Sequence, residues 1–433
     1  MNFQNTSQKP NTRTTTPLLL ILLRSKIVMV FLLVVAWSIS YELISHTTLS
    51  TYSSTFTFPS SSDSSIVFPI SFFDVNVHSY LYKDYVNTLC GVYLSSYFNT
   101  QQVDYFDENT QVVPPTFIGT QLLTIIYGHW SKYIILDRFL STSVSDYIRE
   151  DDFVFFSDGL DVMVNGDLQQ IKQIYFEYLK DENFDITNKN QDWPLLVNSE
   201  KNKWPPLELF KGIKNINEQW LRLHYVQNYP QNKKYCPPNS PFIYLNSGMY
   251  FGRKRDVKSY LKKSFEMVED PSNIFNDDQA TLQTMHVSRF ANNQSTTHYP
   301  IIGDCKAAMG LPTYLACDHI NVGPNFHDPQ STCKVSNNLE PKKTPLVVHS
   351  NGPKCGNFCP CVHQVTRHGR LRNYLEKEMK LQRVASLDGL KNLPKLRVLF
   401  YHSTFDKIKI LELTRFCSAK SLFEISPYKC MLK

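Results

Sequence analysis

Short apolar runs alternate with amphipathic stretches along residues 66–349 of this 433-residue chain. The apolar runs have the length of strands, and the amphipathic stretches have the spacing of helices. Extended runs are expected at residues 66–68, 102–106, 153–156, 195–197, 244–252, 301–302 and 346–348. Helices are expected at residues 85–97, 130–148, 167–179, 253–267 and 277–289. This alternation predicts an α/β fold, with a mostly parallel sheet and helices on both faces.

The N-terminus shows a different pattern. Residues 27–41 are apolar and uncharged, and the residues before them include basic side chains but no acidic one. The run is short for a span of about 20 residues, but apolar residues lengthen it at one end, and Arg24 and Lys26 can reach the interface at the other. Positive charge on the N-terminal side predicts a cytosolic tail at 1–26 and a transmembrane signal anchor at 27–44, with a luminal body. A cleaved signal peptide is the alternative.

Composition and charge exclude two classes of protein for the part of the chain that follows the predicted anchor. Hydrophobic residues make up 42% of the chain, which excludes a disordered protein. The net charge is +6, and four basic residues precede the apolar run, which leaves 6 − 4 = +2 for the rest. That balance argues against a nucleic-acid-binding body. Residues 45–65 are rich in Ser and Thr and predict a flexible stem. Residues 367–433 form a C-terminal extension without an assigned role.

The 10 cysteines are consistent with a luminal body. Disulfides form in oxidising compartments, and a short span suits the thinner membranes of the early secretory pathway. We therefore expect a single-pass type II protein of the endoplasmic reticulum or Golgi membrane. A zinc site formed by Cys355, Cys359, Cys361 and His363 is an alternative, but its spacing is not a standard one. The disulfide connectivity stays open.

The apolar run at residues 153–156 leads directly into two carboxylates, Asp158 and Asp161. Ligands of open α/β sheets bind at the carboxyl ends of strands, so both side chains are expected at a ligand site. Two oxygen ligands suit a hard divalent cation such as Mg²⁺ or Mn²⁺. A strand followed by an Asx turn, with Asp158 capping it, is the alternative.

Three further segments favour a binding site. Asn246 lies within the run at residues 244–252, where strand propensity disfavours it and a ligand or another backbone commonly approaches. Asp277 and Asp278 begin an expected helix, where they either cap it or bind sugar hydroxyls. His349 ends another apolar run and is a plausible third metal ligand beside a carboxylate pair.

These segments resemble the glycosyltransferase domain of the procollagen lysyl hydroxylases. That domain has D-x-x-D after a strand, then S-A-E-x-x-C-W-P, Y-L-N-S-G, D-D-Q and H-x-N-G-P. Here the same order is formed by 158–161, 198–205, 244–248, 277–279 and 349–353, so the resemblance covers residues 66–366. Asn198, Ser199 and Lys203 depart from the family pattern. No His-x-Asp/Glu iron site is found, so lysine hydroxylation is not expected.

The resemblance implies a GT-A fold, a Rossmann-like α/β head that binds a UDP-sugar with Mn²⁺. It implies that Asp158, Asp161 and His349 are the metal ligands. In that family, the metal bridges the two phosphates and stabilises the departing UDP.

Further residues have expected roles around the metal ligands, and all of them except Lys132 lie in the matching motifs. Asn351 and Gly352 would face the diphosphate, and Asp277, Asp278 and Asn246 would line the donor-sugar or acceptor side. Lys132 is a candidate phosphate ligand, with a solvated helix-face lysine as the alternative. Trp204 is a candidate stacking platform for a sugar, with a buried core tryptophan as the alternative.

The expected function is a metal-dependent transfer of a hexose, galactose or glucose, from a UDP-sugar to a luminal protein or glycan. Hydroxylysine of collagen-like sequences is a possible acceptor by resemblance only. One alternative is a catalytically inactive, membrane-anchored glycan-binding or scaffolding protein with the same fold. Another is a lipid-linked or polysaccharide transferase. The stereochemical outcome stays open.

Overall fold

The computed structural model describes a defined set of segments of the chain. These are residues 65–73, 89–101, 112–119, 128–188, 190–206, 210, 236, 240–270, 276–288, 299–322, 335–337, 344–351, 371, 396–402 and 406–417. The expected cytosolic tail and signal anchor lie outside the described residues, as do most of the stem, Gly352 and the cysteines at 355–361. Within the described segments, no helix is both long enough and apolar enough to cross a membrane.

An eight-stranded sheet lies at the centre, in the order β13-β12-β2-β1-β3-β6-β5-β7. Its strands are β1 (Val67–Phe72), β2 (Thr116–Ile118), β3 (Phe153–Asp158), β5 (Leu195–Glu200), β6 (Tyr244–Arg253), β7 (Ile301–Asp304), β12 (Arg397–His402) and β13 (Lys407–Glu412). The pairing gives β12, β2, β1, β3, β5 and β7 one direction, and β6 and β13 the opposite one. The prediction of a mostly parallel sheet is confirmed.

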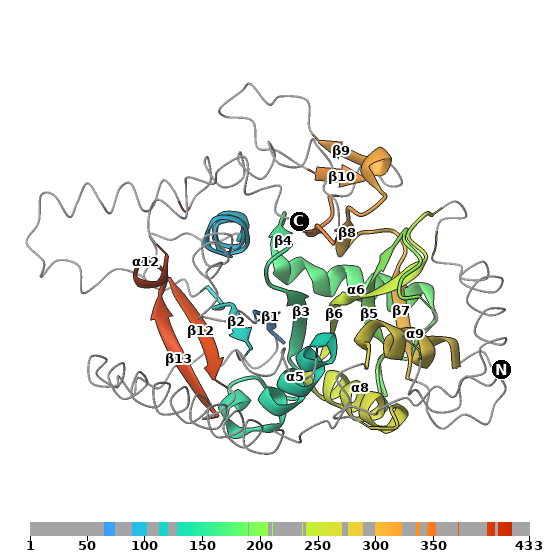
Figure 1. Cartoon of the computed structure of the whole chain (residues 1–433), viewed down its shortest axis with the longest axis horizontal. Coiled ribbons are helices and arrows are strands. Elements are labelled where there is room, and N and C mark those ends of the chain that lie inside the picture. The colour runs from blue at the N-terminus through green and yellow to red at the C-terminus, as the bar shows by residue number, and fades with distance from the viewer. Residues whose placement is uncertain are drawn as a thin grey trace, which may run out of the picture. The chain divides into compact units, whose positions relative to one another are not determined.

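Helices cover both faces of this sheet, as predicted (Figure 1). On one side lie α5 (Ser131–Ser141), α8 (Lys254–Met267) and α9 (Asp278–Ser288). On the other lie α6 (Ile171–Asp181) and the pair formed by η1 (Leu89–Leu94) and α3 (Ser95–Thr100). Successive side chains of a strand point to opposite faces, so the apolar run of β3 is buried from both sides.

The side chains of β3 follow that alternation. Phe153 and Phe155 belong to the hydrophobic core that includes residues of α3 and α6. Phe156 instead stacks on Tyr250, whose ring contacts Tyr260 of α8. Strand β3, which ends at Asp158, is therefore held in place by both helical layers.

The helix expected at residues 130–148 is shorter than predicted. The structure has a 3₁₀ turn, η2 (Gly128–Trp130), then α5, and a second 3₁₀ turn, η3 (Ser143–Ser145). Thr142 is extended, and the hydroxyl of Ser145 donates to the carbonyls of Leu140 and Thr142. Ser and Thr side chains compete for backbone groups in this way, and the apolar spacing alone did not reveal it.

Two small sheets complete the described fold. One has the order β4-β11-β8, formed by β4 (Val162–Val164), β11 (Val347–His349) and β8 (Gly310–Pro312). The other pairs β9 (Ile320–Val322) with β10 (Val335–Asn337). The strand expected at residues 346–348 exists, but it belongs to the first small sheet. Its antiparallel register places His349 opposite Val162, the residue that follows Asp161.

The C-terminal extension takes part in the main sheet. Strand β12 pairs in parallel with β2, and β13 pairs with β12. The short helix α12 (Leu413–Phe416) follows, and Cys417 forms a disulfide with Cys90. A second disulfide joins Cys236 to Cys305, and no described cysteine is free. Residues 62–433 form one compact unit, so this segment packs with the head instead of standing apart.

Candidate active site

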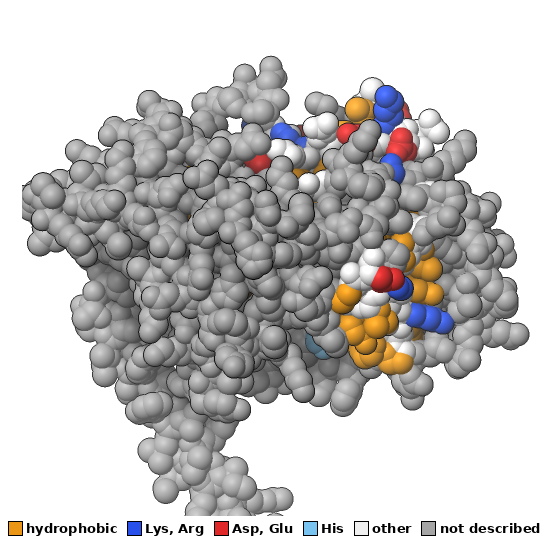
Figure 2. All heavy atoms as spheres, turned by 90° about the horizontal axis from the view of Figure 1, so that it is seen from above, with side chains coloured by type: hydrophobic (Ala, Val, Ile, Leu, Met, Phe, Trp, Pro, Cys, Tyr) orange, Lys and Arg blue, Asp and Glu red, His pale blue; other side chains and the backbone are white. Residues whose placement is uncertain are grey.

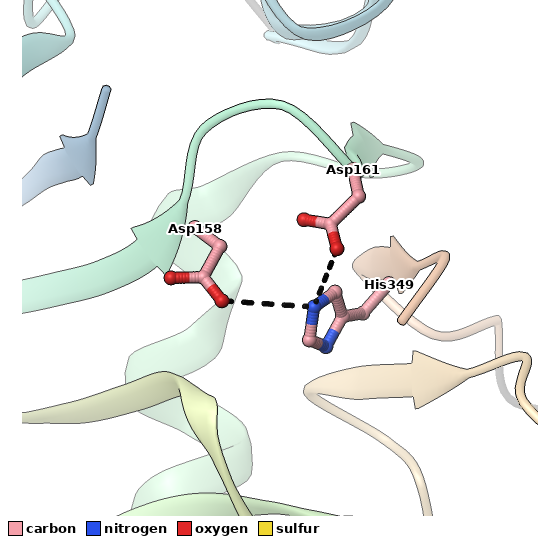
Figure 3. A group of neighbouring side chains, drawn as sticks. All are labelled: Asp158, Asp161 and His349. Carbon is pink, nitrogen blue, oxygen red and sulfur yellow. Dashed lines mark ion pairs between the residues drawn. The ribbon is translucent and has the colours of Figure 1, made fainter. Parts of the chain in front are cut away.

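Asp158, Asp161 and His349 converge on one point, as the sequence predicts. Asp158 ends β3, Asp161 lies in the loop to β4, and His349 ends β11, and the three side chains point toward one another (Figure 3). One ligand atom from each residue lies within 4.8 Å of the others. Nε2 of His349 is 3.3 Å from Oδ2 of Asp161 and 4.0 Å from Oδ2 of Asp158.

The arrangement fits a divalent cation. The imidazole of His349 is buried, yet neither of its nitrogens has a hydrogen-bond partner among the described residues, and the same is true of Oδ1 of Asp161. Buried polar atoms without partners are rare unless a water or an ion satisfies them. Two carboxylates and one imidazole form a donor set that suits Mn²⁺ and similar ions.

Gly248 of β6 leaves space for the side chains of His349 and Asp158. A Cβ on Gly248 would lie 2.4 Å from Cε1 of His349 and 2.9 Å from Oδ2 of Asp158. Any larger residue would displace both candidate ligands. This explains the glycine in mid-strand that the sequence singled out as a place of close approach.

Each of the three groups has its pKa shifted by at least one of the other two. Burial raises the pKa of Asp158, although Lys132 and His349 oppose this shift. Burial acts in the same direction on Asp161, but His349 and Lys132 outweigh it, so the pKa of Asp161 is lowered. Burial lowers the pKa of His349, but Asp161 and Asp158 outweigh it and raise it above its ordinary value. The two carboxylates therefore favour the protonated form of His349, and a bound cation would compete with that proton.

Lys132 is not a solvated surface lysine. Its side chain is 7% exposed and links the candidate metal site to the start of α9. Nζ lies 2.7 Å from Oδ2 of Asp278 and 3.4 Å from Oδ1 of Asp158. These two carboxylates raise the pKa of Lys132 against the opposing effect of burial. The ammonium is thus a fixed positive charge between two acidic groups.

Asp277 caps α9. Its Oδ1 accepts a hydrogen bond of 2.7 Å from the backbone N–H of Ala280, so the capping alternative is confirmed for this residue. Its Oδ2 makes no hydrogen bond to a described residue. Burial, with Asp278 next to it, raises the pKa of Asp277 to about 6. One oxygen is therefore committed to the helix, and the other remains available for a ligand.

Glu200, at the end of β5, connects three of the sequence motifs. Its Oε1 accepts hydrogen bonds from Nδ2 of Asn246 (3.1 Å) and Nε2 of Gln279 (2.8 Å). Its Oε2 accepts one from Nδ2 of Asn351 (2.6 Å). Burial raises the pKa of Glu200, and these donors oppose that shift. The sequence analysis did not assign roles to Glu200 or Gln279; their position inside recurring motifs was the only signal.

Trp204 is exposed, not a core residue. Four large hydrophobic side chains are exposed among the described residues, namely Phe176, Ile186, Trp204 and Leu315. The carbonyl of Trp204 accepts hydrogen bonds from the side chains of Gln279 (2.9 Å) and Gln283 (2.6 Å), both on α9. Figure 2 shows one face of the molecule, on which described hydrophobic side chains gather beside charged ones. The backbone of Trp204 is thus held next to the Glu200 network, and the residue remains exposed.

Asn351 is half-buried and lies between two loops. Its Nδ2 donates to Glu200, and its Oδ1 accepts a hydrogen bond of 3.2 Å from the N–H of Tyr314. It follows His349 by two residues, so it lies close to the candidate metal ligands. Gly352 lies outside the described residues, and its expected role at the diphosphate stays a prediction.

No protein-family model matches the chain, and no curated protein sequence matches it. Among solved structures, the chain is similar to the apo form of WbbM, a bifunctional glycosyltransferase, at 11% identity and a TM-score of 0.34, covering 72% of this chain. It spans about half of that protein (51%). It is also similar to the galactosyltransferase LgtC with donor and acceptor sugar analogues, at 11% identity and a TM-score of 0.30, covering 67% of this chain and 88% of LgtC. An active-site variant of LgtC gives a TM-score of 0.29 at the same identity and coverage.

Proposed function

We propose that the protein is a metal-dependent glycosyltransferase that moves a hexose from a UDP-sugar, UDP-galactose or UDP-glucose, to a luminal protein or glycan. Hydroxylysine of collagen-like sequences is the acceptor that the motif resemblance suggests. The proposal is carried by one observation: Asp158, Asp161 and His349, from distant parts of the chain, bring their ligand atoms within 4.8 Å of one another. The nitrogens of His349, which make no hydrogen bond to a described residue, support a cation at this place.

Each part of the site has a task in this reaction. Asp158, Asp161 and His349 would hold Mn²⁺ or a similar cation, which supplies positive charge to stabilise the diphosphate leaving group. Lys132 adds a second fixed positive charge beside Asp158. Glu200 fixes the amide groups of Asn246 and Asn351, which then present the same polar atoms to each substrate. Preorganised groups of this kind need no rearrangement as charge develops.

The hydrogen bonds of Glu200 also support the family assignment. They connect residues of the N-S-E, Y-L-N-S-G, D-D-Q and H-x-N-G-P motifs, and Lys132 connects the D-x-x-D motif to D-D-Q. Motifs that match by chance have no reason to meet in space. We therefore propose a GT-A type head, in which Trp204 is a stacking surface for a sugar.

We further propose that this head is luminal and is anchored by residues 27–44 in the endoplasmic reticulum or Golgi membrane. The disulfides Cys90–Cys417 and Cys236–Cys305 support an oxidising compartment.

The test is a donor screen on the purified luminal portion, in which UDP release is measured with and without Mn²⁺. We expect release from UDP-galactose or UDP-glucose that a chelator abolishes, and Asp161→Asn should reduce it at least about 100-fold, as loss of a transition-state charge contact does. The matched control is Asp151→Asn, which removes an exposed carboxylate from the opposite end of β3. UDP release that ignores the chelator, or no release from any donor, would contradict the proposal. Glycan binding without turnover would favour the scaffolding alternative.

A further inference from the structure

The turn that follows β8 carries an exposed leucine in an unfavourable backbone conformation. The N–H of Ala316 donates to the carbonyl of Thr313 at 3.2 Å, which closes a turn over residues 313–316. Leu315, the third residue of this turn, has a φ of 56° and is 55% exposed. A turn with positive φ at its third residue favours glycine there, because a Cβ destabilises this conformation. Neither the backbone conformation nor the burial of apolar surface therefore explains a leucine at this position.

This turn is attached to the candidate metal site by two hydrogen bonds. The N–H of Thr313 donates to the carbonyl of His349 at 2.9 Å. The N–H of Tyr314 donates to Oδ1 of Asn351 at 3.2 Å. Both acceptors belong to the segment that ends β11 and supplies one of the three candidate metal ligands. Leu315 is therefore held at the edge of the site by the chain that forms it.

Glu200 connects this turn to the exposed Trp204. Its Oε2 accepts a hydrogen bond of 2.6 Å from Asn351. Its Oε1 accepts one from Nε2 of Gln279, which also donates to the carbonyl of Trp204. Two of the four exposed large hydrophobic residues that the structure describes, Trp204 and Leu315, are thus linked to the two oxygens of one carboxylate. The site has polar groups at its centre and an exposed apolar residue on each of these two sides.

We propose that Leu315 is an acceptor-contact residue, and that it selects polypeptide acceptors in which apolar side chains flank the hydroxyl-bearing residue. This inference rests on the proposed function and names its acceptor class. A leucine offers no charge to a diphosphate. It also offers no hydrogen bond to a sugar hydroxyl, which would lose its bonds to water against it. An apolar peptide side chain, in contrast, gains free energy when it covers exposed leucine.

The first test compares two hydroxylysine peptides that have either valine or serine on both sides of the hydroxylysine. With wild-type protein, KM should be about tenfold lower for the valine peptide, as burial of one apolar side chain predicts. Leu315→Asn keeps a residue that adopts positive φ but removes the apolar surface, so the two KM values should become nearly equal. Leu315→Met keeps an apolar side chain and should preserve the preference. Hydrolysis of the UDP-sugar without peptide should be the same in all three proteins.

Ile186→Asn is the matched control. Ile186 is also an exposed large hydrophobic residue, at 44%, and lies in the loop after α6. In the same loop, Phe184 contacts Trp193, which precedes the first residue of β5, whereas Glu200 is its last residue. Ile186 and Leu315 are therefore near opposite ends of this strand. Ile186→Asn should leave the preference for the valine peptide unchanged.

The second test needs no turnover. Fluorescein-labelled forms of the same two peptides are titrated with protein in the presence of Mn²⁺ and UDP, and fluorescence anisotropy reports binding. Wild-type protein and Leu315→Met should bind the valine peptide more tightly, and Leu315→Asn should not discriminate. The unfolding temperature of Leu315→Asn should equal that of wild type, because asparagine is favoured in this conformation. A leucine that served only the turn would not affect the preference between peptides.

The two tests separate this inference from the proposed function. If no donor releases UDP, but binding shows a preference for the valine peptide that Leu315→Asn removes, the proposed function fails and the contact stands. If UDP release is metal-dependent but wild-type protein does not discriminate between the peptides, the inference is overturned and the proposed function stands. The inference is also overturned if Leu315→Asn discriminates as wild type does, if it raises KM for the UDP-sugar alone, or if a free glycan is the acceptor and neither peptide is.

Discussion

At the scale of single residues, the candidate metal centre depends on a glycine, because no side chain fits at that position. Gly248 lies where β6 passes closest to His349 and Asp158, and a Cβ there would approach Cε1 of His349 to 2.4 Å and Oδ1 of Asn246 to 2.8 Å. Real Cβ atoms do not approach heavy atoms so closely, so the ligands or the strand would have to move. The positions of the ligands are thus set by steric fit as well as by charge.

We predict that Gly248→Ala weakens Mn²⁺ binding by about tenfold or more, because about 1–3 kcal/mol of overpacking strain falls on the ligands themselves. Titration calorimetry with Mn²⁺ measures this. The matched control is Gly252→Ala on the same strand, where the new Cβ would meet Cδ2 of Leu195 in the core at the same distance of 2.4 Å. Gly252→Ala should lower the unfolding temperature but leave the Mn²⁺ affinity unchanged. Equal Mn²⁺ affinities for Gly248→Ala and wild type would refute the prediction.

Sequence reasoning found the residues whose chemistry is visible in a local pattern. Asp158, Asp161 and His349 follow apolar runs, and the structure brings them together. Glu200 was not assigned a role, because its importance comes from accepting hydrogen bonds from residues 46, 79 and 151 positions away. Local patterns also could not decide between the two environments considered for Lys132 and for Trp204, since burial depends on which helices pack over each residue.

At the scale of elements, the start of α9 holds two adjacent carboxylates with opposite effects on stability. Asp278 forms a buried ion pair with Lys132. Asp277 forms no such ion pair with a described residue, and burial together with Asp278 raises its pKa from 3.8 to about 6. Between those values the folded chain holds a proton that the unfolded chain releases. The contribution of Asp277 therefore favours folding at low pH and is lost as pH rises through about 6.

We predict that Asp277→Asn stabilises the metal-free protein above pH 7 by about 2–3 kcal/mol, since each unit of pKa shift corresponds to about 1.4 kcal/mol. The amide keeps an oxygen to cap the N–H of Ala280 and carries no charge. Urea unfolding at pH 5, 6, 7 and 8 measures the effect. Asp278→Asn is the contrast: it leaves Lys132 without its nearest carboxylate and should destabilise by about 2–3 kcal/mol at each pH. The interpretation fails if Asp277→Asn is no more stable than wild type at pH 8.

Helices and strands, like single residues, were predicted where the pattern is local and were missed where they depend on contacts with distant parts of the chain. The long strands β3 and β6 and the helices α6, α8 and α9 were predicted from periodicity, and each lies within a few residues of its expected position. The strands β2, β4 and β8 have three residues each and were not predicted, although β11, which is equally short, was. Yet the pairing of β4 with β11 is what sets His349 beside Asp161. The candidate ligands could be found from the sequence, but the small sheet that brings them together could not.

At the scale of the whole molecule, the C-terminal segment continues the main sheet beyond β2. Val398, Leu399 and Tyr401 of β12 are buried, and Phe400 stacks on Phe117 of β2. Sequence analysis gave this segment no role, because parallel pairing between residues 116–118 and 399–401 joins parts of the chain that no local pattern links. The segment also supplies Cys417, the disulfide partner of Cys90.

We predict that the protein of residues 62–366 is far less stable than that of residues 62–433. Truncation exposes β2 as an unpaired edge, uncovers Phe117, and removes a disulfide between residues 327 positions apart. We expect poor soluble yield and loss of a single cooperative unfolding transition. The double variant Cys90→Ala/Cys417→Ala in residues 62–433 isolates the cross-link, which should contribute about 5–6 kcal/mol in a chain-entropy account. This variant should still unfold cooperatively because the strands remain. A 62–366 protein whose unfolding temperature equals that of 62–433 would show that β12 and β13 are dispensable for the sheet that positions Asp158.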